Sequence, residues 1–418
     1  MRTRNKIRVD KITGVPLVFL FNLIARFLGV LLRIDHSFSK PPARIAVCKF
    51  MGMGSIIQSL PLLTTLKKNF PAAGIIYIST EKNKELLKLL SAADEIATVD
   101  DSNLFKLFFS TIGLLFRLWK KRIDIYIDLE TYSYFSTLIT TMSCSCNRLG
   151  FYRQDAGVRL GVYTHMMYFN IKSPVSEAYL QMARLAGCNE TVNEIPKINI
   201  DDSVKKSLSG KLINVSAQQI IVVNPNASDL RIERRWNSES YAKVITLLAE
   251  KYLQAIFVLT GSASETAWVN EIENEIDNKK KSQVVNIAGK ISLPELFAAI
   301  HEANLVITND SGPMHIAYAM QKPVVALFGP CSPQQYGVNP NGIVIYKNIY
   351  CSPCVHDFII PPCKGDNQCM KLISIDEVVN ACCHLLDGNA PASYPGSSSS
   401  IIYNTWLGNS PLGIVTRN

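Results

Sequence analysis

Segments typical of strands and of helices alternate along most of this chain, and this alternation constrains the fold more than any other feature. In the first half, the strand-like runs are ARIAVCKF (43–50), GIIYIST (74–80) and IDIYIDL (123–129). In the second half, they are QIIVVNPNA (219–227), AIFVLTG (255–261), VVNIAG (284–289), LVITND (305–310) and PVVALFG (323–329). Because strands and helices that alternate in this way form parallel, doubly wound sheets, we predict an α/β fold.

The length of the chain favours two such domains. A single hydrophobic core stops growing at roughly 250–300 residues, and this chain has 418. We expect the polar residues 201–218 to connect an N-terminal domain, residues 43–200, to a C-terminal domain, residues 219–387. Residues 388–418 are rich in Ser, Gly, Pro and Asn, and we expect them to be a disordered tail.

The net charge of +9 is concentrated at the N-terminus. Residues 1–49 hold ten Lys and Arg against two Asp, a net +8, so the remaining chain is nearly neutral. These charges flank the apolar segment Gly14–Leu32, and basic flanks of this kind favour an anionic membrane surface. Nucleic-acid binding would require basic residues spread over a folded face with aromatic residues between them, and the sequence indicates no such face.

We expect residues 1–40 to associate with a membrane. The apolar segment is nearly long enough to span a bilayer, but Asn22 and Arg26 lie in its middle, and a charge at the bilayer centre costs roughly 3 kcal/mol or more. An interfacial helix with Arg26 snorkelling to the headgroups is favoured over a span, and a helix packed on the domain is the alternative. A second apolar stretch, Leu104–Lys121, is expected to be an amphipathic helix, either in the core or in contact with the membrane.

The cysteines favour a reducing compartment. There are eleven, an odd number scattered through both halves, and no small-x-small cleavage site follows the apolar segment. Four of them form the pattern Cys351-x2-Cys354-x8-Cys363-x5-Cys369, which is spaced like a zinc site. Free or partly buried thiols are the favoured interpretation, and no bound metal is expected.

The loop after the run LVITND carries the most informative motif. In an open α/β sheet, ligands bind beyond the carboxyl ends of the strands, where helix N-termini converge. LVITNDSGPMHIAYAM places Asp310, Ser311 and Gly312 in a tight turn before a helix. The free backbone N–H groups of this turn, together with Ser311, Gly312 and His315, can bind a diphosphate. The alternative is that Asp310 only caps the helix and that His315 lies on the surface.

Two more loops follow strands of the same domain. SDLRIERRWNSES (228–240) carries Arg234 and Arg235, which can stabilise a leaving diphosphate without a metal; the alternative is an ordinary solvated loop. TGSASETAW places Gly261 at a strand end and Glu265 in the first turn of the next helix. A carboxylate there can accept hydrogen bonds from both ribose hydroxyls, or can merely stabilise the helix N-terminus. No Asp-x-Asp pair that would hold a divalent metal stands out.

These motifs together resemble glycosyltransferase family 9, the ADP-heptose–lipopolysaccharide heptosyltransferases and their relatives. The resemblance runs from about Arg44 to Leu386 and is strongest in VITNDSGPMHIAYAMQKPVVALFGP. NPNAS…RRW, TGSASE and AGKISLPEL occur in the family's order, and the Cys-Ser-Pro-Cys loop is common among its members. In the first domain, KFMGMGSIIQSLP is a Gly turn leading into a helix, without the Gly-Lys-Ser/Thr of a P-loop.

The resemblance implies a GT-B architecture, in which two Rossmann-like domains face a central cleft. The first domain would bind mainly the acceptor and the second the nucleotide sugar, with inversion at the anomeric centre and no catalytic metal. The donor-binding residues that it implies line the diphosphate and sugar (Asp310, Ser311, Gly312, His315), hold the ribose (Glu265, beside Gly261) or lie near the phosphates (Ser228, Arg234, Arg235).

One departure from the family pattern concerns the catalytic base. Family heptosyltransferases have Gly-Asp in the first-domain turn, with the Asp as the proposed base, whereas this chain has Gly54-Ser55. A serine cannot deprotonate an acceptor hydroxyl near neutral pH unless another group activates it. We expect the base to be Glu130, or Asp128, at the end of the run IDIYIDLE. The alternatives are a different acceptor or lost catalysis.

We therefore expect an inverting, metal-independent glycosyltransferase that moves a heptose or related sugar from an NDP-sugar, ADP-heptose by family default, to a lipopolysaccharide or other surface glycan. It would need no cofactor. Its partners would be the donor, a lipid-linked or lipopolysaccharide acceptor and the cytoplasmic face of the bacterial inner membrane, which it would contact as a peripheral or monotopic protein. The alternatives are a non-catalytic partner that binds nucleotide sugars or glycan lipids, and a sugar-nucleotide epimerase of the same architecture.

Overall fold

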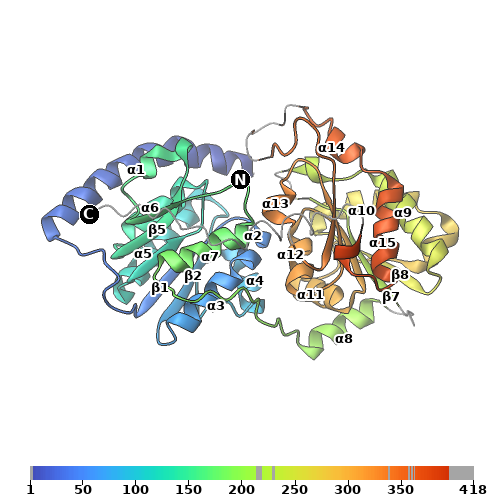
Figure 1. Ribbon diagram of the computed structural model, residues 1–418, viewed down its shortest axis with the longest axis horizontal. Coiled ribbons are helices and arrows are strands. Elements are labelled where there is room, and N and C mark those ends of the chain that lie inside the picture. The colour runs from blue at the N-terminus through green and yellow to red at the C-terminus, as the bar shows by residue number, and fades with distance from the viewer. Residues whose placement is uncertain are drawn as a thin grey trace. The chain divides into compact units, whose positions relative to one another are not determined.

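The structure is a computed structural model that describes residues 3–212, 219–227, 231–337, 339–355, 358, 361 and 363–394. The described chain divides into two compact units, the first ending at Pro196 and the second beginning at Lys197. Each unit contains a parallel sheet of six strands with helices on its faces (Figure 1). The predicted α/β fold with two Rossmann-like domains is therefore confirmed.

The first unit has the strand order β3-β2-β1-β4-β5-β6, which is the order of a doubly wound sheet. Its strands are β1 (Arg44–Cys48), β2 (Gly74–Thr80), β3 (Glu95–Val99), β4 (Ile125–Asp128), β5 (Asn147–Tyr152) and β6 (His165–Tyr168). All four residues of β4 and the last four of β1 are buried, as expected for central strands that are covered on both faces. The carboxyl ends of β1 and β4 therefore lie side by side.

The helices of the first unit connect these strands. They are α2 (Met53–Gln58), α3 (Leu60–Asn69), α4 (Lys84–Leu89), α5 (Leu104–Lys121), α6 (Tyr134–Met142) and α7 (Val175–Leu185), with the short turns η1 (Glu81–Asn83) and η2 (Gln154–Arg159). The helix expected after the Gly turn is divided at Ser59 into α2 and α3. Proline lacks a backbone N–H and is tolerated in the first turn of a helix, so Pro61 begins α3 rather than continuing α2.

The second unit repeats the same topology, with the order β12-β11-β10-β7-β8-β9. Its strands are β7 (Gln219–Asn224), β8 (Ala255–Leu259), β9 (Val284–Asn286), β10 (Leu305–Asn309), β11 (Val324–Phe328) and β12 (Gly342–Tyr346). Its longer helices are α9 (Ser238–Lys251), α10 (Thr266–Glu275), α11 (Leu293–Glu302), α12 (Gly312–Ala319) and α15 (Ile375–Leu386). The hydrophobic core of this unit surrounds Trp236 and Tyr241, which are both fully buried. Most of its residues come from four strands and one helix: β7, β8, β10, β11 and α9.

Most of the described residues between 201 and 212, where the sequence predicts a connection, form the helix α8 (Asp202–Lys211), which packs on α11. The Ser207 hydroxyl donates to Glu295 Oε1 at 2.7 Å, and Lys211 Nζ lies 2.6 Å from the same oxygen. Lys211 and the Ser292 backbone lower the pKa of Glu295 to about 2. α8 is thus held to the second unit by a charged contact. Of the predicted tail, residues 395–418 lie outside the described residues.

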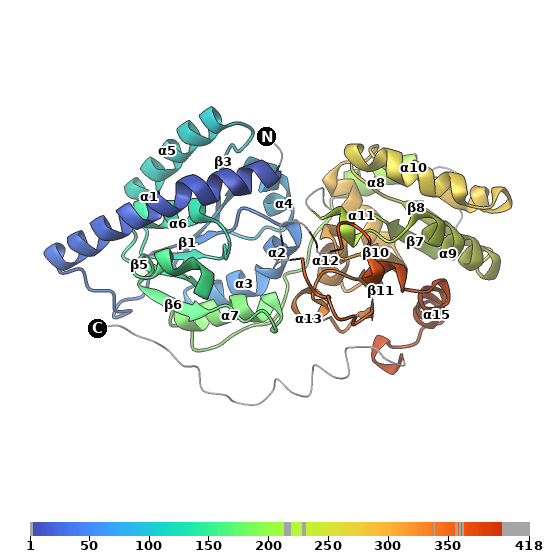
Figure 2. The same ribbon diagram turned by 90° about the horizontal axis from the view of Figure 1, so that it is seen from above.

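Helix α1 (Thr3–Leu32) lies on the outside of the first unit and packs against α6 (Figures 1 and 2). The Asp10 carboxylate accepts from the backbone N–H groups of Tyr134 (2.9 Å) and Phe135 (2.7 Å), so it caps the N-terminus of α6. Gly14 allows close contact between the two helices, because a Cβ at this position would lie 2.4 Å from Tyr134 Cβ.

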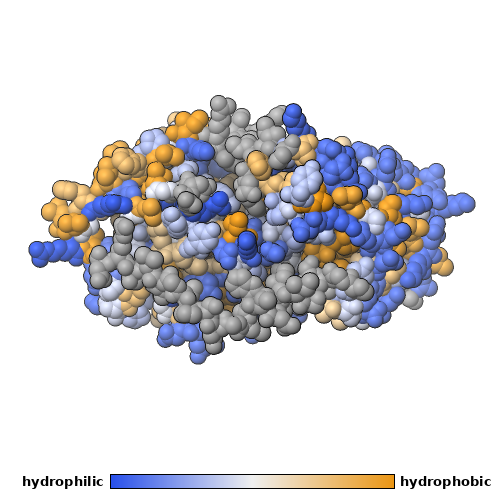
Figure 3. Space-filling view, turned by 45° about the horizontal axis from the view of Figure 1, so that its top comes forward, coloured by the Kyte–Doolittle hydropathy of each residue, from blue (hydrophilic) through white to orange (hydrophobic). Residues whose placement is uncertain are grey.

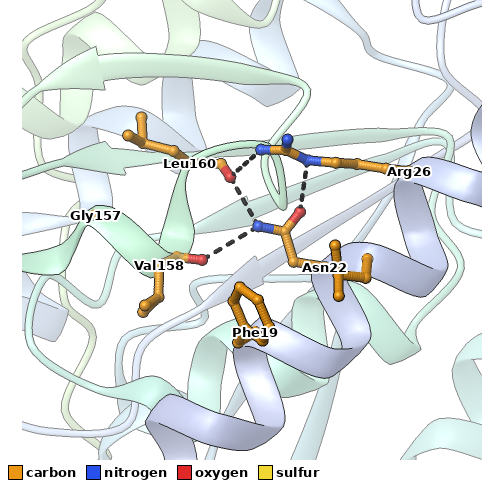
Figure 4. A pocket seen from close by; sticks show the side chains of 7 residues that line it. Phe19, Asn22, Arg26, Gly157, Val158 and Leu160 are labelled. Carbon is orange, nitrogen blue, oxygen red and sulfur yellow. Dashed lines mark hydrogen bonds between the residues drawn. The ribbon is translucent and has the colours of Figure 1, made fainter.

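The two polar residues in the middle of α1 also contact the protein. Asn22 Nδ2 donates to the carbonyls of Val158 (3.3 Å) and Leu160 (2.8 Å), and Arg26 Nη2 donates to the carbonyl of Leu160 at 2.6 Å (Figure 4). These contacts border a pocket of about 290 Å³ between α1 and η2. Arg26 is exposed, but its Nη2 binds the Leu160 carbonyl of the first unit, so part of its guanidinium faces the protein; its contact with lipid headgroups stays a prediction.

Gly14→Ala and Gly29→Ala make the same change in the same helix and should have different effects on the free energy of unfolding. Each replaces Gly by a better helix former, which is worth up to about 1 kcal/mol. At Gly29 no atom lies within 4 Å of the new Cβ, so the gain should remain. At Gly14 the clash with Tyr134 should instead cost roughly 1–3 kcal/mol. Chemical denaturation measures both, and equal effects would contradict the packing of α1 on α6.

Candidate functional site

In the second unit, side chains at the carboxyl ends of β7 and β10 form hydrogen bonds with one another. These strands are parallel neighbours, and their register places Asn224 opposite Thr308. Asn224 Nδ2 donates to Thr308 Oγ1 at 3.2 Å and to Ser311 Oγ at 2.9 Å. The Thr308 and Ser311 hydroxyls lie 3.0 Å apart. The turn that begins at Asp310 is therefore fixed to the end of β7.

Asn309 connects the same turn to the loop after β7. Its Nδ2 donates to the carbonyls of Pro225 (2.9 Å) and Asn226 (3.3 Å), and its Oδ1 accepts from Tyr241 at 2.9 Å. Asn226 Nδ2 in turn donates to the carbonyl of Thr260 at 2.7 Å, after β8. Three strand ends are thus joined by buried amides. The sequence analysis missed these asparagines, although polar residues that end apolar strands were a signal for them.

The turn itself leads directly into α12. Ser311 is the N-cap residue, with an extended backbone (φ −155°), and its side chain makes no capping hydrogen bond. The alternative that Asp310 caps this helix is therefore wrong. Asp310 is 4% exposed, and its Oδ2 lies 3.3 Å from Arg234 Nη1. The side chains at the start of α12 thus leave its first backbone N–H groups available to an anion.

Arg234 and Arg235 place positive charge beside this turn. Burial opposes the charge of Arg234, but Cys331 and Asp310 outweigh it and raise the pKa of the guanidinium. Arg235 lies over the ring of Trp268, 5.3 Å from its centroid, and its Nη2 is 3.9 Å from Glu265 Oε1. Among the described residues, the Nε atoms of both arginines lack a hydrogen-bond partner. These two Nε atoms are buried, so an anion would be bound by the terminal guanidinium nitrogens.

Glu265 divides its two oxygens between different contacts. Oε2 accepts from the backbone N–H of Ser262 at 2.8 Å and from the Ser262 hydroxyl at 2.7 Å, which completes a capping box. Oε1 faces Arg235 at a longer distance, 3.9 Å. The helix-stabilising role that the sequence allowed is therefore present. Gly261, just ahead of Ser262, lies at the end of β8, where a Cβ would meet Asn226 Nδ2 at 3.0 Å.

His315 is buried in the first turn of α12. It is 6% exposed, so the alternative of a surface residue is wrong. Burial lowers its pKa to about 4; the nearby Asp310 raises it and Arg234 lowers it further. The imidazole is consequently neutral at pH 7 and can donate one hydrogen bond without adding charge. The positive charge at this site comes from the arginines.

In the first unit, Glu130 binds the Gly turn that follows β1. It is 2% exposed, and its Oε1 accepts from the backbone N–H groups of Phe50 and Met51, both at 2.8 Å. Its Oε2 lies 3.0 Å from Lys49 Nζ. Burial opposes the charge of Lys49, but Glu130 outweighs it and raises the pKa of the ammonium. The carboxylate thus holds the segment that leads to Ser55.

Asp128 lies deeper than Glu130. It is fully buried, its Oδ1 accepts from the Glu130 backbone N–H at 3.0 Å, and its Oδ2 accepts from the hydroxyls of Tyr163 (2.7 Å) and Ser136 (2.9 Å). Burial raises its pKa to about 6. Ser55, by contrast, is half-buried on α2, and a hydrogen bond from it lowers the pKa of Tyr179 against the effect of burial.

Two further sequence interpretations concern the donor loops and the cysteines. Ser228 lies outside the described residues. Cys351, Cys354, Cys363 and Cys369 form no disulfide bonds. Burial, reinforced by the neighbouring thiols, raises the pKa of Cys369 to about 11. In the part of the chain that the structure describes, no three His, Cys, Asp or Glu side chains are grouped as metal ligands.

A family model and curated relatives both indicate one family. The model of glycosyltransferase family 9 (heptosyltransferase) matches residues 114–360. Lipopolysaccharide heptosyltransferase 3 of Escherichia coli is 24% identical over 351 residues, which are 81% of this chain and 97% of that protein.

Two solved structures share the fold at 23% sequence identity. The E. coli ADP-heptose lipopolysaccharide heptosyltransferase II has a TM-score of 0.67 and covers 82% of this chain and 98% of its own. A family 9 glycosyl transferase from Veillonella parvula has a TM-score of 0.70 and covers 84% and 99%.

The burial of His315 predicts a pH dependence of stability. An unfolded histidine takes up a proton near pH 6.5, whereas the folded His315 does so only near pH 4. The free energy of unfolding should therefore fall as pH drops from 6.5 to 4, by on the order of 3 kcal/mol from this group. Urea unfolding at pH 7 and 4.5 should show a smaller fall in His315→Asn than in the wild type. His301→Asn, with a largely exposed side chain, is the matched control. A fall of equal size in all three proteins would contradict the burial of a neutral His315.

Proposed function

This chain belongs to glycosyltransferase family 9, and we propose on that basis that it transfers a heptose or related sugar from an NDP-sugar, by preference ADP-heptose, to a lipopolysaccharide or other surface glycan. By their names, the two E. coli relatives described above act on lipopolysaccharide, and one of them on ADP-heptose. The observation that carries the proposal is the set of hydrogen-bonded loops at the carboxyl edge of the second sheet. Among these relatives, the alternative of a non-catalytic partner finds no support.

The donor diphosphate would bind at the turn that starts α12. Ser311 and Gly312 would offer backbone N–H groups, while Asn224 keeps Ser311 in place. Arg234 and Arg235 would stabilise the negative charge that develops on the leaving nucleoside diphosphate. Because two guanidinium groups can supply this charge, we propose a transfer that does not require a metal ion.

The remaining donor contacts fall to three side chains. Glu265 would accept from the ribose hydroxyls through Oε1, since Oε2 is bound to Ser262. His315, neutral at pH 7, would donate one hydrogen bond to the phosphates or the sugar. Asp310 would orient Arg234 and contact the sugar.

Inversion requires a base that removes the proton of the acceptor hydroxyl. Both carboxylates are buried, but we favour Glu130 over Asp128 because its Oε1 contacts the turn that leads to Ser55, whereas Asp128 is bonded to the interior hydroxyls of Tyr163 and Ser136. Both oxygens of Glu130 are occupied, Oε1 by two backbone N–H groups and Oε2 by Lys49, so an acceptor hydroxyl can reach Oε2 only when Lys49 moves away. We therefore propose that Glu130 accepts the proton after Lys49 turns toward another anion.

We propose that transfer takes place at the cytoplasmic face of the inner membrane. The concentration of basic residues in the first 49 positions supports this location. So does one helical stretch, Val9–Leu32, that is long and apolar enough to cross a membrane by length and composition alone.

Arg235→Met should weaken the binding of ADP about 10- to 100-fold, because a charge-assisted hydrogen bond is worth roughly 1.5–3 kcal/mol. Calorimetric titration of the purified protein with ADP measures the dissociation constant. Lys279→Met removes a charge from η5 (Asn278–Gln283), ahead of β9 in the same unit, and should leave binding unchanged. Equal affinities in the wild type and in both variants would contradict the proposed donor site.

The variant Glu130→Gln tests whether Glu130 is the catalytic base or only holds the Gly turn in place. Loss of the base should lower kcat at least about 100-fold, with little change in the KM for the donor, and should remove the acidic limb of the pH–rate profile. Lys49→Met breaks the same ion pair and is the comparison variant. If both variants lower kcat equally and retain the wild-type pH profile, Glu130 is not the base.

A further inference from the structure

The outward face of α1 is apolar along most of its length. Its polar residues Asp10, Asn22 and Arg26 bind to α6 and to the segment 158–160 of the first unit. Large apolar side chains point the other way: Phe27 is 70% exposed and Val30 is 81% exposed. A helix on the surface of a protein in water has the opposite arrangement, with its polar face outward. An exposed apolar surface of this kind marks a site that contacts a membrane or another protein.

A second helix of the same unit presents the same kind of surface. α5 buries Leu114, Leu115 and Leu118 in the core that also contains Ile139 of α6, so α5 and α6 cover the same face of the sheet. The outward side of α5 carries Phe105, Phe108, Phe109 and Phe116, all more than half exposed.

The outward surfaces of α1 and α5 lie on the same side of the unit. α1 packs on α6, and Trp119 of α5 donates through Nε1 to the carbonyl of Met142 at 2.7 Å, at the end of α6. α1 and α5 thus both contact α6. Hydrophobic side chains gather over this part of the first unit in the space-filling view (Figure 3). We name the exposed apolar residues of α1 and α5 the two-helix face.

The charges on the outward sides of α1 and α5 are basic; the nearby carboxylates of Asp100 and Glu95 pair with Lys106, Arg117 and Lys121 of α5, and Asp35 follows α1. α5 contains no Asp or Glu, and the single acidic residue of α1, Asp10, is bound to the N-terminus of α6. Basic residues flank the apolar stretches: Lys11 on α1 and Arg33 just after it, and Lys120 and Arg122 at the end of α5, all exposed. Apolar and aromatic side chains bordered by Lys and Arg match a bilayer with anionic headgroups.

We propose that the two-helix face docks on an anionic lipid bilayer, with α1 lying along the membrane surface instead of crossing it. This inference deepens the membrane location proposed above and is independent of the sugar-transfer chemistry. To cross the bilayer, α1 would have to leave α6 and give up the hydrogen bonds of Asp10, Asn22 and Arg26. It would then bring the Arg26 charge to the bilayer centre, at roughly 3 kcal/mol or more. Lying flat keeps every one of these contacts and still buries the apolar residues.

Flotation with lipid vesicles tests the docking face. The full-length protein should float with vesicles of phosphatidylcholine containing a quarter phosphatidylglycerol, and less with phosphatidylcholine alone. The double variant Phe105→Ser/Phe108→Ser should bind the anionic vesicles roughly tenfold less tightly or worse, because each buried Phe contributes about 1.5–3 kcal/mol. Leu253→Ser, an equally exposed apolar position in the second unit, is the matched control and should bind like the wild type.

The same samples distinguish this inference from the proposed function. ADP binding should be unchanged in all variants, since the substitutions lie away from the second unit or from its site, and normal ADP binding also shows that the protein is folded. Unchanged flotation of the double variant would overturn the docking face and leave the donor site untouched. Sedimentation velocity without lipid tests whether the two-helix face binds a second copy of this chain instead. A dimer that the wild type forms and the double variant does not would assign the face to that second copy and overturn the proposal.

The location of the N-terminus distinguishes an α1 that lies along the membrane from an α1 that crosses it. An epitope tag before α1 should resist protease added to intact spheroplasts and become sensitive after lysis, because a flat helix keeps it on the side of the two units. Cleavage of the tag in intact spheroplasts, with the second unit protected, would show that α1 crosses the membrane. That result would overturn the in-plane arrangement.

Discussion

The candidate donor site depends on the buried amide of Asn309. This single side chain donates to two backbone carbonyls of the loop after β7 and accepts from Tyr241, which belongs to α9. With Asn224, it fixes three loops at one edge of a parallel sheet. An unsatisfied buried amide would cost roughly 1–3 kcal/mol, so these loops have one low-energy arrangement. The first N–H groups of α12 and the two arginines are positioned by that arrangement.

The two units use buried polar groups in a similar way. In the second unit amides hold the loops, and in the first unit a carboxylate does so, since Glu130 binds the backbone of the Gly turn and pairs with Lys49. Both arrangements lie at carboxyl edges of doubly wound sheets, where the chain must leave a buried strand and begin a helix. Backbone N–H groups at such places need acceptors, and those left without one are available to a ligand.

The sequence was sufficient to predict the fold, because periodicity and turn residues determine it locally. The predicted helix at 375–386 matches α15, and the strand before Asp310 ends where the pattern indicates. The division of the helix near Pro61 required only the chemistry of proline. The packing of α8 on α11 could not be predicted, since it depends on Glu295 lying more than eighty residues away.

The site was less accessible to sequence reasoning. The motif singles out Asp310, Ser311 and His315, but neither the burial of His315 nor the pairing of Asp310 with Arg234 can be predicted from it. Similarly, the sequence placed Arg26 in an apolar segment, where only the tertiary structure shows that a carbonyl of the first unit binds it. Local patterns give the type of a side chain and its position along the chain, whereas burial and partners depend on residues far away in sequence.

The central claim is that these loops bind a nucleoside-diphosphate sugar for transfer to a glycan. The most direct test incubates the full-length protein with a panel of NDP-sugars and a lipopolysaccharide acceptor that lacks heptose, followed by mass spectrometry of the glycan. The account predicts that one heptose is added per acceptor, with release of an equal amount of ADP. Release of nucleotide from any donor without a heavier glycan, or no reaction across the whole panel, would contradict it.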